Sequence, residues 1–410
     1  MPTFRNLTED LMAADDTIVA LQTKLTSFQA RSPEQGGDGE EEKTEWLRTW
    51  LLAHGIADLE LIRAPDTRVT SGSRPNLIAK IPGETQETVW IFAHTDVVDA
   101  GDRSAWTHDP WTVHREGDWL FGRGVEDNQQ ALVSTLILAD ALQRLGIVPR
   151  RTLGMVFMAD EESGSAHGLG YVLEKRPELF SAKDIYLVPD FGSPDASVIE
   201  IAEKGACWYR IECTGKQCHA STPEKGVNAF VASSALALAV SEELPKLFSK
   251  SDPLFSPPVS TFVPSMPLTV TQGINIVPGK AIFHLDCRIL PEIDETEVKK
   301  ALENIAGDIA RRYSVAVDIQ TVQMQKASRA ALNGPGEKVL KEAISAVYGN
   351  SPRLRGLGGG TVAAHLRHKG IAALVWSCIT NTCHEPNERS SITATKKDSC
   401  VFAHMLDSTQ

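Results

Sequence analysis

Apolar runs alternate with amphipathic stretches through the first half of the chain. The runs TVWIFA (88–93), LGMVFMAD (153–160) and DIYLVP (184–189) are typical of buried strands, and QQALVSTLILADALQRLG (129–146) has the spacing of a helix. The stretch EEKTEWLRTWLLAHG (41–55) predicts another helix, with acidic residues in its first turn. Strands that are hydrophobic throughout and alternate with helices indicate a sheet covered on both faces. The predicted fold class is therefore α/β, with a mixed, mostly parallel sheet.

A different pattern begins at about Lys204 and continues to about residue 326. Its strands and helices follow the order β-α-β-β-α-β, from GACWYRIECTG (205–215) to VAVDIQTVQM (315–324). That order is typical of a small, ferredoxin-like α+β sandwich. The length of 410 residues also favours more than one domain. We expect a main domain formed by residues 1–203 and 327–410 and an inserted domain formed by residues 204–326.

Side chains that can bind metals follow the predicted strands of the main domain. They are His94, Asp127, Glu161, Glu162, Asp190 and His384. In an open α/β sheet, the loops at the carboxyl ends of the strands gather in one crevice, so ligands dispersed in the sequence can meet there. Two histidines and four acids supply what a pair of divalent metals with an activated water between them requires.

Composition narrows the possible partners and compartment. A formal charge of −12 argues against a nucleic-acid partner, which favours a basic surface. Residues 1–16 lack the basic and apolar regions of a signal peptide, and the longest apolar tract (131–142) is too short to span a bilayer. The seven cysteines include no C-x-x-C pair, which is typical of reduced thiols. We expect a cytoplasmic protein without a membrane or nucleic-acid partner.

Six sequence motifs occur in the order seen in one known family. They are AHTDVV (93–98), GRGVEDN (122–128), MADEESGS (158–165), GKQCHASTPEKGVNA (215–229), GINIVPG…DCR (273–288) and GLGGGT (356–361). From about residue 40 to its C-terminus the chain resembles the co-catalytic metallopeptidase family. That family includes acetylornithine deacetylase, succinyl-diaminopimelate desuccinylase, aminoacylase, bacterial glutamate carboxypeptidase and carnosinase-like dipeptidases. The resemblance implies a zinc-exopeptidase-like catalytic domain with an inserted lid that also makes the dimer contact.

The resemblance also implies a role for each strand-end residue. Asp127 matches the carboxylate that bridges both metals, and its bond to the next residue is expected to be cis. Glu161 matches the general acid/base, and Glu162 matches a metal ligand. DNQQ (127–130) stands where an Asp-x-Lys-Gly form is frequent, which leaves the subfamily open. The implied ligand sets are His94, Asp127 and Asp190 for one metal and Asp127, Glu162 and His384 for the other. The expected cofactors are two divalent ions, zinc first, with manganese and cobalt as alternatives.

Plainer explanations exist for several of these positions. Asp96 lies two residues after His94 and, if the strand geometry persists, on the same face. Its carboxylate could then accept the other imidazole N–H, or it could simply be a polar residue at a strand end. Asp127 could cap the helix that follows it. Glu161 and Glu162 could be surface acids that open a helix.

The predicted substrate contacts lie farther along the chain. Arg288 suits bidentate recognition of a carboxylate, and Asn275 lies at the other end of the same predicted hairpin. Gly358, Gly359 and Gly360 would let a carboxylate approach backbone N–H groups closely. The alternatives are an ordinary salt bridge for Arg288 and a tight turn for the glycines.

His219 belongs to the segment GKQCHAS, which resembles the family segment whose histidine reaches the partner subunit's active site. In that role His219 would donate a hydrogen bond to the developing oxyanion, in a homodimer formed through the lids. The alternative is a histidine that supports the lid at a strand-to-loop corner.

With the resemblance, these residues predict a metal-dependent hydrolase that cleaves a peptide or amide bond next to a free amino-acid carboxylate. Glu161, Asp96 and His219 would be its catalytic residues, and a small peptide or N-acyl amino acid its substrate. One alternative is an N-acyl-amino-acid deacylase, such as a succinyl-diaminopimelate desuccinylase or an acetylornithine deacetylase. A remote alternative is a non-catalytic metal-binding scaffold, which the loss of a ligand or of the base would favour. None of these residues is lost.

Overall fold

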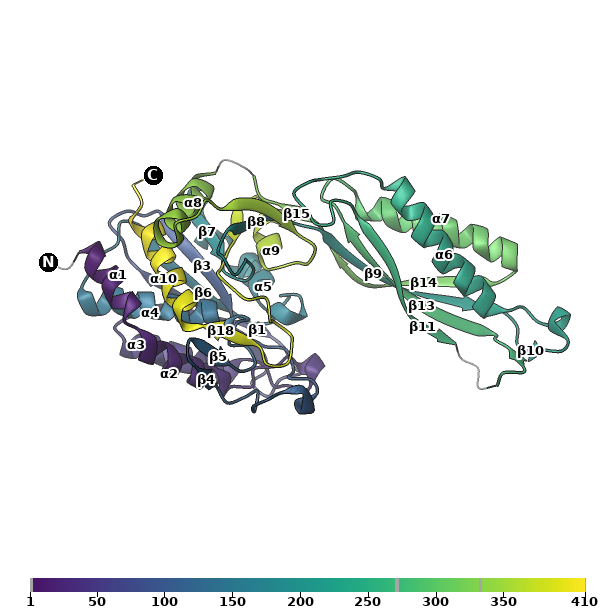
Figure 1. Ribbon diagram of the computed structural model, residues 1–410, viewed down its shortest axis with the longest axis horizontal. Coiled ribbons are helices and arrows are strands. Elements are labelled where there is room, and N and C mark those ends of the chain that lie inside the picture. The colour runs from purple at the N-terminus through teal and green to yellow at the C-terminus, as the bar shows by residue number, and fades with distance from the viewer. Residues whose placement is uncertain (1–2, 270–272, 332–333, 410) are drawn as a thin grey trace. The chain divides into compact units, whose positions relative to one another are not determined.

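The computed structural model describes residues 3–269, 273–331 and 334–409 and divides into two compact units (Figure 1). Unit 1 comprises Met1–Ile201, Ala330–Leu354 and Thr361–Gln410, and unit 2 comprises Ala202–Arg329 and Arg355–Gly360. The sequence predicts an inserted domain at 204–326 and leaves residues 355–360 in the main domain. The catalytic and lid roles of the two domains stay predictions.

Most of unit 1 is built on a mixed sheet with the strand order β1-β2-β6-β3-β7-β17-β8-β15, in which β16 also pairs with β8 and β15 belongs to unit 2. The strands are β1 (Asp58–Pro65), β2 (Ser73–Ile81), β3 (Thr88–His94), β6 (Thr152–Met158), β7 (Ile185–Val188), β8 (Val198–Glu203), β15 (Ser328–Arg329), β16 (Arg353–Leu357) and β17 (Ala373–Val375). The pairs β6–β3, β3–β7 and β7–β17 are parallel, and the other pairs along this order are antiparallel. The α/β fold class is confirmed, and along this order the parallel pairs join the four strands β6, β3, β7 and β17.

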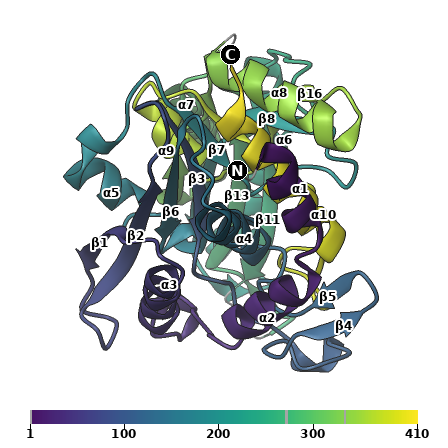
Figure 2. The same cartoon turned by 90° about the vertical axis from the view of Figure 1, so that its left-hand side faces the viewer.

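Helices cover both faces of this sheet, as its hydrophobic strands predict. β3 is buried along its whole length. On one face, α4 (Gln129–Leu145) packs against β3 and β6 and is itself covered by α10 (Ile392–Asp407). On the other face, α5 (Leu169–Lys175) and α9 (Ala363–His368) pack around Trp90 and Phe92 (Figure 2). The sheet is therefore the core of unit 1.

The remaining elements of unit 1 lie around this core. The helices are α1 (Phe4–Met12), α2 (Asp15–Thr26), α3 (Glu41–Ala53) and α8 (Pro335–Tyr348), and the 3-10 turns are η1 (Pro33–Gln35), η2 (Arg103–Ala105), η3 (Glu161–Ser163) and η4 (Pro177–Leu179). A separate three-stranded sheet joins β18 (Arg389–Ser391), β5 (Trp119–Phe121) and β4 (His114–Glu116) in that order. Within the described ranges, no helix is long and apolar enough to cross a bilayer.

Unit 2 is a four-stranded antiparallel sheet with helices on one face. The sheet has the order β11-β13-β9-β14. Its elements are β9 (Gly205–Thr214), β10 (Cys218–His219), η5 (Pro223–Lys225), α6 (Ala229–Leu247), β11 (Thr261–Thr269), β12 (Ile276–Val277), β13 (Lys280–Ile289), α7 (Glu295–Tyr313) and β14 (Ala316–Gln325). Residues of both helices and of the central strands form one buried cluster. The order β9-α6-β11-β13-α7-β14 confirms the predicted β-α-β-β-α-β insert.

Candidate metal centre

Neighbouring parallel strands bring the predicted strand-end residues to one edge of the sheet. β3 ends at His94, which is in register with the last residue of β6. The turn after β6 carries Glu161 and Glu162, and Asp190 follows β7, the other neighbour of β3. His384 follows β17, which pairs in parallel with β7. Because the four strands run in the same direction, their carboxyl ends meet at this edge.

Asp127 lies between the two imidazoles. Its Oδ1 is 2.8 Å from Nε2 of His94, and its Oδ2 is 3.2 Å from Nε2 of His384. The N-cap residue of α4 is Asn128 rather than Asp127, and the peptide bond between them is cis, as the resemblance implies. A carboxylate that presents one oxygen to each side has the arrangement of a bridging ligand.

Two further acids complete two groups around Asp127. Oδ1 of Asp190 is 3.5 Å from Nε2 of His94, and Oε2 of Glu162 is 3.1 Å from Nε2 of His384. The five residues predicted as ligands therefore lie together, in the two sets that the resemblance implies. Imidazole nitrogens and carboxylate oxygens are the donors that Zn²⁺, Co²⁺ and Mn²⁺ accept in proteins. The donor set fits two divalent cations.

The crowded acids concentrate negative charge in this centre. Burial and the neighbouring Asp190 raise the pKa of Glu161 well above its usual range, and burial with Asp127 raises the pKa of Glu162 to about 7. Hydrogen bonds to Asp127 and Glu162 raise the pKa of the His384 imidazole to about 11. These shifts have related origins, because negative charges lie close together where little water reaches them. Bound cations would relieve that repulsion.

Glu161 differs from the other acids in its contacts. Its carboxylate lies within 4.8 Å of ligand atoms of His94 and Asp190. Within the described part of the chain, that carboxylate has no hydrogen-bond or ion-pair partner. An acid that faces the centre without an imidazole partner is able to exchange a proton there.

Asp96 positions His94, Glu161 and Glu162 through its backbone carbonyl and its carboxylate. Nδ1–H of His94 donates to the carbonyl oxygen of Asp96 at 3.0 Å, and the Asp96 carboxylate lies 3.4 Å from the same nitrogen. Because a carbonyl can only accept, this bond leaves Nε2 as the ligand atom. The carboxylate also accepts the backbone N–H groups of Glu161 and Glu162, each at 3.1 Å. The sequence predicts only the contact with the imidazole.

Asn128 is a contact that sequence reasoning missed. Its Nδ2 donates to Oδ1 of Asp190 at 2.6 Å and to the carbonyl oxygen of Pro189 at 3.0 Å. The amide therefore orients a predicted ligand from the second residue of DNQQ. Asn128 stands at the variable position of the Asp-x-Lys-Gly form, so the sequence carries no signal for this contact.

Glu126 connects the segment of Asp127 to the segment of His384. It is buried, and one of its oxygens accepts the backbone N–H and the hydroxyl of Thr380. Its other oxygen accepts the N–H of Thr382 at 2.5 Å and the hydroxyl of Thr382 at 2.9 Å. These four bonds fix the loop that leads to His384.

Glu388 makes the reverse connection. It lies shortly after His384, is fully buried, and accepts the backbone N–H groups of Gly124, Glu126 and Asp127 at 2.9 to 3.0 Å. The two glutamates therefore form a reciprocal clamp. Glu126 belongs to the quoted motif GRGVEDN and Glu388 to none of the quoted motifs, and a buried acid surrounded by donors looks like any surface acid in a sequence.

A buried ion network supports the turn that carries Glu161. The guanidinium of Arg74 is fully buried and donates to Oε2 of Glu40 at 2.6 Å and to Oδ1 of Asp160 at 3.3 Å. Asp160 has a φ of 63°, in the left-handed region that few non-glycine residues adopt. Its contacts with Arg74 hold that conformation, which turns the chain sharply between β6 and Glu161.

The predicted residues of unit 2 fall into two groups. His219 of β10 pairs with β12, and the carbonyl oxygen of Asn275 accepts the N–H of Ala220 at 2.8 Å, so His219 and Asn275 lie on one hairpin. Nδ1 of His219 accepts the backbone N–H of Ser221 at 3.1 Å, which places the imidazole proton on Nε2. The exposed ring is therefore a hydrogen-bond donor at Nε2.

Arg288 lies with the glycine loop in the same unit. Its guanidinium is paired with Asp286 at 2.8 and 3.1 Å and donates to the carbonyl oxygen of Gly358 at 3.2 Å. The guanidinium also lies 5.8 Å from the ring of Trp208. A Cβ on Gly360 would lie 2.3 Å from the side chain of Gln325, so this position has no room for a larger residue. How these residues act with the metal centre stays a prediction.

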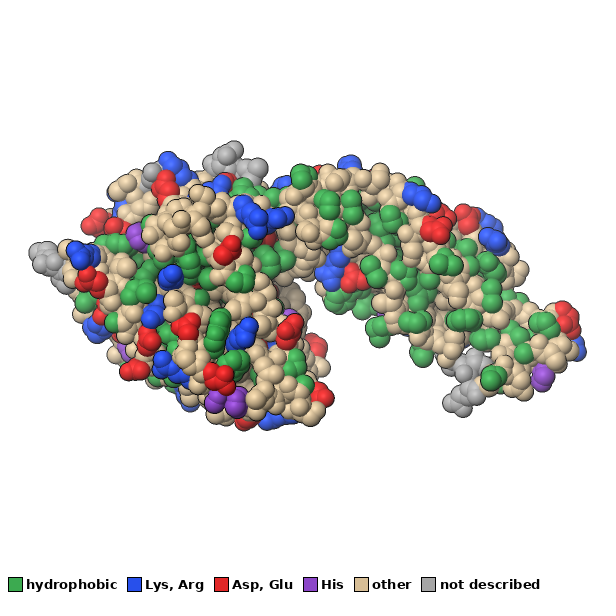
Figure 3. Space-filling view, in the orientation of Figure 1, with side chains coloured by type: hydrophobic (Ala, Val, Ile, Leu, Met, Phe, Trp, Pro, Cys, Tyr) green, Lys and Arg blue, Asp and Glu red, His purple; other side chains and the backbone are tan. Residues whose placement is uncertain are grey.

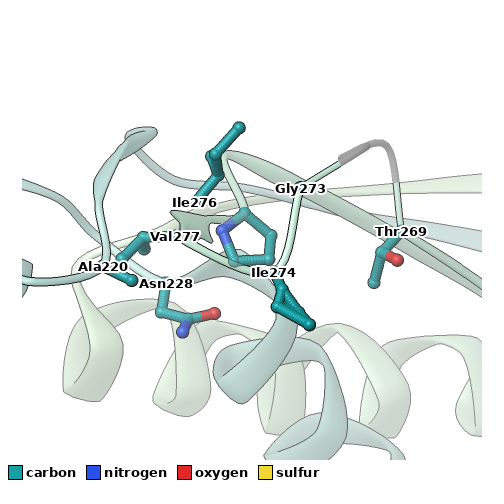
Figure 4. A pocket seen from close by; sticks show the side chains of 8 residues that line it. Ala220, Asn228, Thr269, Gly273, Ile274, Ile276 and Val277 are labelled. Carbon is teal, nitrogen blue, oxygen red and sulfur yellow. The ribbon is translucent and has the colours of Figure 1, made fainter.

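A pocket of about 550 Å³ lies beside the β10–β12 hairpin of unit 2 (Figure 4). It is lined by Ala220, Asn228, Thr269, Gly273, Ile274, Ile276, Val277 and Pro278. The side-chain oxygen of Asn228 accepts the first N–H groups of α6, so it serves as a helix cap. None of these eight side chains is titratable. The pocket supplies shape rather than an acid, a base or a metal ligand.

Comparison with known proteins places the chain among metallohydrolases. A profile described as Peptidase family M20/M25/M40 matches residues 90–408. The chain is 33% identical over 409 residues to an uncharacterized metallohydrolase of Methanococcus maripaludis, a match that covers 95% of this chain and 99% of the relative. It is 29% identical to a succinyl-diaminopimelate desuccinylase of Gluconobacter oxydans, over 90% of this chain and 91% of the relative. A dipeptidase of Saccharomyces cerevisiae has the same fold, with a TM-score of 0.77 at 14% identity, over 100% of this chain and 99% of that chain.

Proposed function

The chain belongs to Peptidase family M20/M25/M40, and on that premise we propose that it hydrolyses the peptide or amide bond next to a free amino-acid carboxylate in small substrates. The observation that carries this proposal is the pair of ligand groups that share Asp127. Each group adds one imidazole and one further acid to that shared carboxylate. Such an arrangement is suited to holding two cations on either side of a single scissile bond. The activity would be that of a dipeptidase or carboxypeptidase.

The proposed cofactors are two zinc ions, with manganese or cobalt as substitutes. His94 and Asp190 would hold one ion, Glu162 and His384 the other, and Asp127 both. When bound, the ions supply polarisation of the scissile carbonyl and a lower pKa for the attacking water. Donor chemistry supports zinc, because imidazole nitrogen is among its preferred ligands.

Glu161 is the proposed general base and general acid. Its carboxylate faces the centre without an imidazole partner, and its pKa is raised by burial and by Asp190. It would take the proton of the attacking water and then deliver that proton to the leaving amine. A raised pKa suits both steps, since the group must accept a proton and give it up near neutral pH.

Recognition of the free carboxylate is assigned to Arg288, with Asn275 and the loop Gly358–Gly360. The pairing with Asp286 and Gly358 holds the Arg288 guanidinium in a fixed orientation. A fixed guanidinium recognises a carboxylate at a lower entropic cost than a flexible one. The same ion pair is the plainer alternative, in which Arg288 only stabilises unit 2.

A homodimer through unit 2 is the proposed assembly, with His219 acting in the partner's site. The exposed Nε2–H of His219 can donate a hydrogen bond, which is what stabilises an oxyanion. β11 is an edge strand, and hydrophobic side chains gather on the surface of unit 2 (Figure 3). The exposed ones include Phe230, Val231 and Leu238 of α6 and Val263, Met266 and Leu268 of β11. Apolar patches and edge strands favour association.

A second candidate function is deacylation of an N-acyl amino acid. It is favoured by the 29% identity to a succinyl-diaminopimelate desuccinylase, which covers nine-tenths of both chains. The chemistry of the centre would be unchanged, because an N-acyl group and a peptide present the same amide to it.

For either substrate a cytoplasmic location is proposed, supported by seven free cysteines.

The test is hydrolysis by protein loaded separately with Zn²⁺, Mn²⁺ or Co²⁺. The substrates are dipeptides, N-acetyl and N-succinyl amino acids, and the same compounds with an amidated carboxyl terminus. We expect turnover to require two metal equivalents and to fall strongly on amidation, and Arg288→Ala to weaken only the binding of free-acid substrates. Turnover of N-succinyl substrates alone would establish the second candidate. Binding of both metals without turnover of any of these substrates would support the remote alternative, a non-catalytic metal-binding scaffold.

A further inference from the structure

A second group of metal-binding side chains lies outside the centre described above. His108 precedes β4, and His114 and Glu116 are the first and last residues of that short strand. Because side chains alternate along a strand, His114 and Glu116 project from the same face of β4. The imidazole rings of His108 and His114 are stacked with centroids 3.6 Å apart. Three donors from two segments therefore converge on one surface point.

The distances between these donors suit one cation. Oε1 of Glu116 is 3.2 Å from Nε2 of His114 and 3.7 Å from Nε2 of His108. A tetrahedral cation about 2.1 Å from each ligand atom separates those atoms by about 3.4 Å. One atom from each residue lies within 4.8 Å of the others, so small ring rotations would close the set. The side chains are 37%, 40% and 59% exposed, which leaves the site open to solvent.

The segment that carries His108 is held in place without a cation. Oδ1 of Asp109 accepts from Arg103 at 2.6 Å, and Oδ2 of Asp109 accepts the hydroxyl of Thr112 at 3.2 Å. On the other side, the N–H of Thr107 donates to Oδ1 of Asn387 at 2.8 Å. Because contacts on both sides of His108 already fix this segment, a cation would bind it at a lower cost in conformational entropy.

The charges around this group favour a cation as well. Among the described residues, the only ion-pair partners of Glu116 are the two imidazoles. Arg115, between His114 and Glu116, is directed to Asp15 instead, 3.8 Å away. With neutral imidazoles, the group has a net negative charge, and within the described ranges no lysine or arginine forms an ion pair with it.

We propose that His108, His114 and Glu116 form a third metal site, for one Zn²⁺-class cation bound by two nitrogens and one oxygen. Such a donor set selects Zn²⁺, Co²⁺, Ni²⁺ or Cu²⁺ over Mg²⁺ and Ca²⁺, which prefer oxygen ligands. The fourth position is open to water. The cation would join the loop before β4 to the β4–β5 hairpin, and through Thr107 it would stabilise the position of Asn387, close in sequence to His384.

The test counts metals on the whole protein after equilibrium dialysis against micromolar Zn²⁺. At that concentration we expect the native chain to bind one more equivalent of Zn²⁺ than His114→Ala or Glu116→Gln. In either variant the affinity for the third Zn²⁺ should be at least tenfold lower. The matched control is Arg115→Gln, which changes the same strand on its other face and should keep the third equivalent. Added Zn²⁺ should raise the melting temperature of the native chain beyond that of His114→Ala.

A second measurement separates this site from the centre. Hydrolysis and the two tight equivalents should be unchanged in His114→Ala, because none of the centre's ligands is altered. Equal metal counts in the native chain and in both variants would overturn the third site whatever the activity. Loss of the third equivalent in a protein that hydrolyses no tested substrate would support the third site and reject only the proposed function.

Discussion

Glu161 and Glu162 are neighbours in the chain, but their contacts give them different chemistry. Glu162 lies 3.1 Å from the imidazole of His384, whereas the carboxylate of Glu161 faces His94 and Asp190 and, among the described residues, has no hydrogen-bond or ion-pair partner. Consecutive residues can differ in this way because η3 turns sharply after Asp160. At the scale of single residues, burial and neighbouring charge would decide which of the two acids binds a cation and which carries a proton.

Glu161→Gln tests this division. The amide keeps the size of the side chain but cannot accept the proton of water, so we expect both metals to be retained and kcat to fall by about 10²–10⁴-fold. Metal analysis and steady-state kinetics on the same sample provide the measurement. Glu162→Gln is the matched control, and it should lose metal as well as activity. Near-normal turnover in Glu161→Gln would remove Glu161 from the mechanism.

Metal binding should weaken as the pH falls. The pKa of His384 is raised to about 11 and that of Glu162 to about 7, so the cation-free centre holds the imidazole proton at neutral pH and gains the carboxyl proton below about pH 7. A cation must displace these protons, so affinity should fall by at least about tenfold per pH unit and more steeply below pH 7. Competition with a chelator of known pH dependence between pH 6 and 8 measures this. An affinity independent of pH would contradict it.

At the scale of elements, the sheet brings the ligands together and the loops set their final positions. Four ligands follow parallel neighbours β3, β6, β7 and β17 and reach one edge because those strands share a direction. Asp127 instead precedes α4, after a strand of the separate small sheet. The reciprocal clamp of Glu126 and Glu388 joins this segment to the loop of His384. Buried carboxylates that accept several N–H groups hold such loops firmly.

Glu126→Gln should loosen the His384 loop. Its amide nitrogen cannot accept from the N–H and hydroxyl groups of one threonine, so two of the four bonds that Glu126 accepts would be lost. Contacts that orient metal ligands typically contribute about 10–100-fold to metal affinity or activity, and we expect a loss in that range. The readout is metal affinity together with kcat/KM. Glu385→Gln, an exposed acid in the same loop, should be neutral. Equal behaviour of the two variants would show that the clamp does not position His384.

At the scale of the whole molecule, the chain combines one core that carries the candidate metal centre with a second core that does not. Unit 2 leaves the large sheet after β8 and returns at β15, and those strands pair with each other. The predicted ligands and the base belong to unit 1, whereas His219, Asn275, Arg288 and the glycine loop belong to unit 2. If unit 2 forms the dimer contact and His219 acts in the partner's site, each active site would need residues from both chains.

Mixed dimers test that requirement. Chains with His219→Ala and chains with Glu161→Gln should each be nearly inactive alone, since loss of an oxyanion donor costs about 10²–10³-fold. If His219 acts in the partner's site, subunit exchange should restore one intact site in each mixed dimer. Exchange is confirmed by mass or light scattering, and activity is then measured. Confirmed exchange without recovery, or a fully active monomer, would assign His219 to a role within its own chain or to the support of unit 2.

The sequence by itself determined the fold class and the order of elements in the inserted unit, and it predicted the residues that the structure brings together in the candidate metal centre. Strand and helix periodicity depends on nearby residues, so runs such as TVWIFA and QQALVSTLILADALQRLG predict β3 and α4 closely. The position of His94, Glu161 and Asp190 after such strands was sufficient to place them at one edge.

Only the tertiary structure decided the contacts between distant segments. The bonds of Glu126 to Thr380 and Thr382, of Asn128 to Asp190 and of Arg74 to Asp160 join residues far apart in the chain. The order in which the strands pair and the convergence of His108 with His114 and Glu116 are also set by packing. The physical reason is that an acid or an amide carries no local pattern, because its role depends on burial and on which donors the fold brings within about 3 Å.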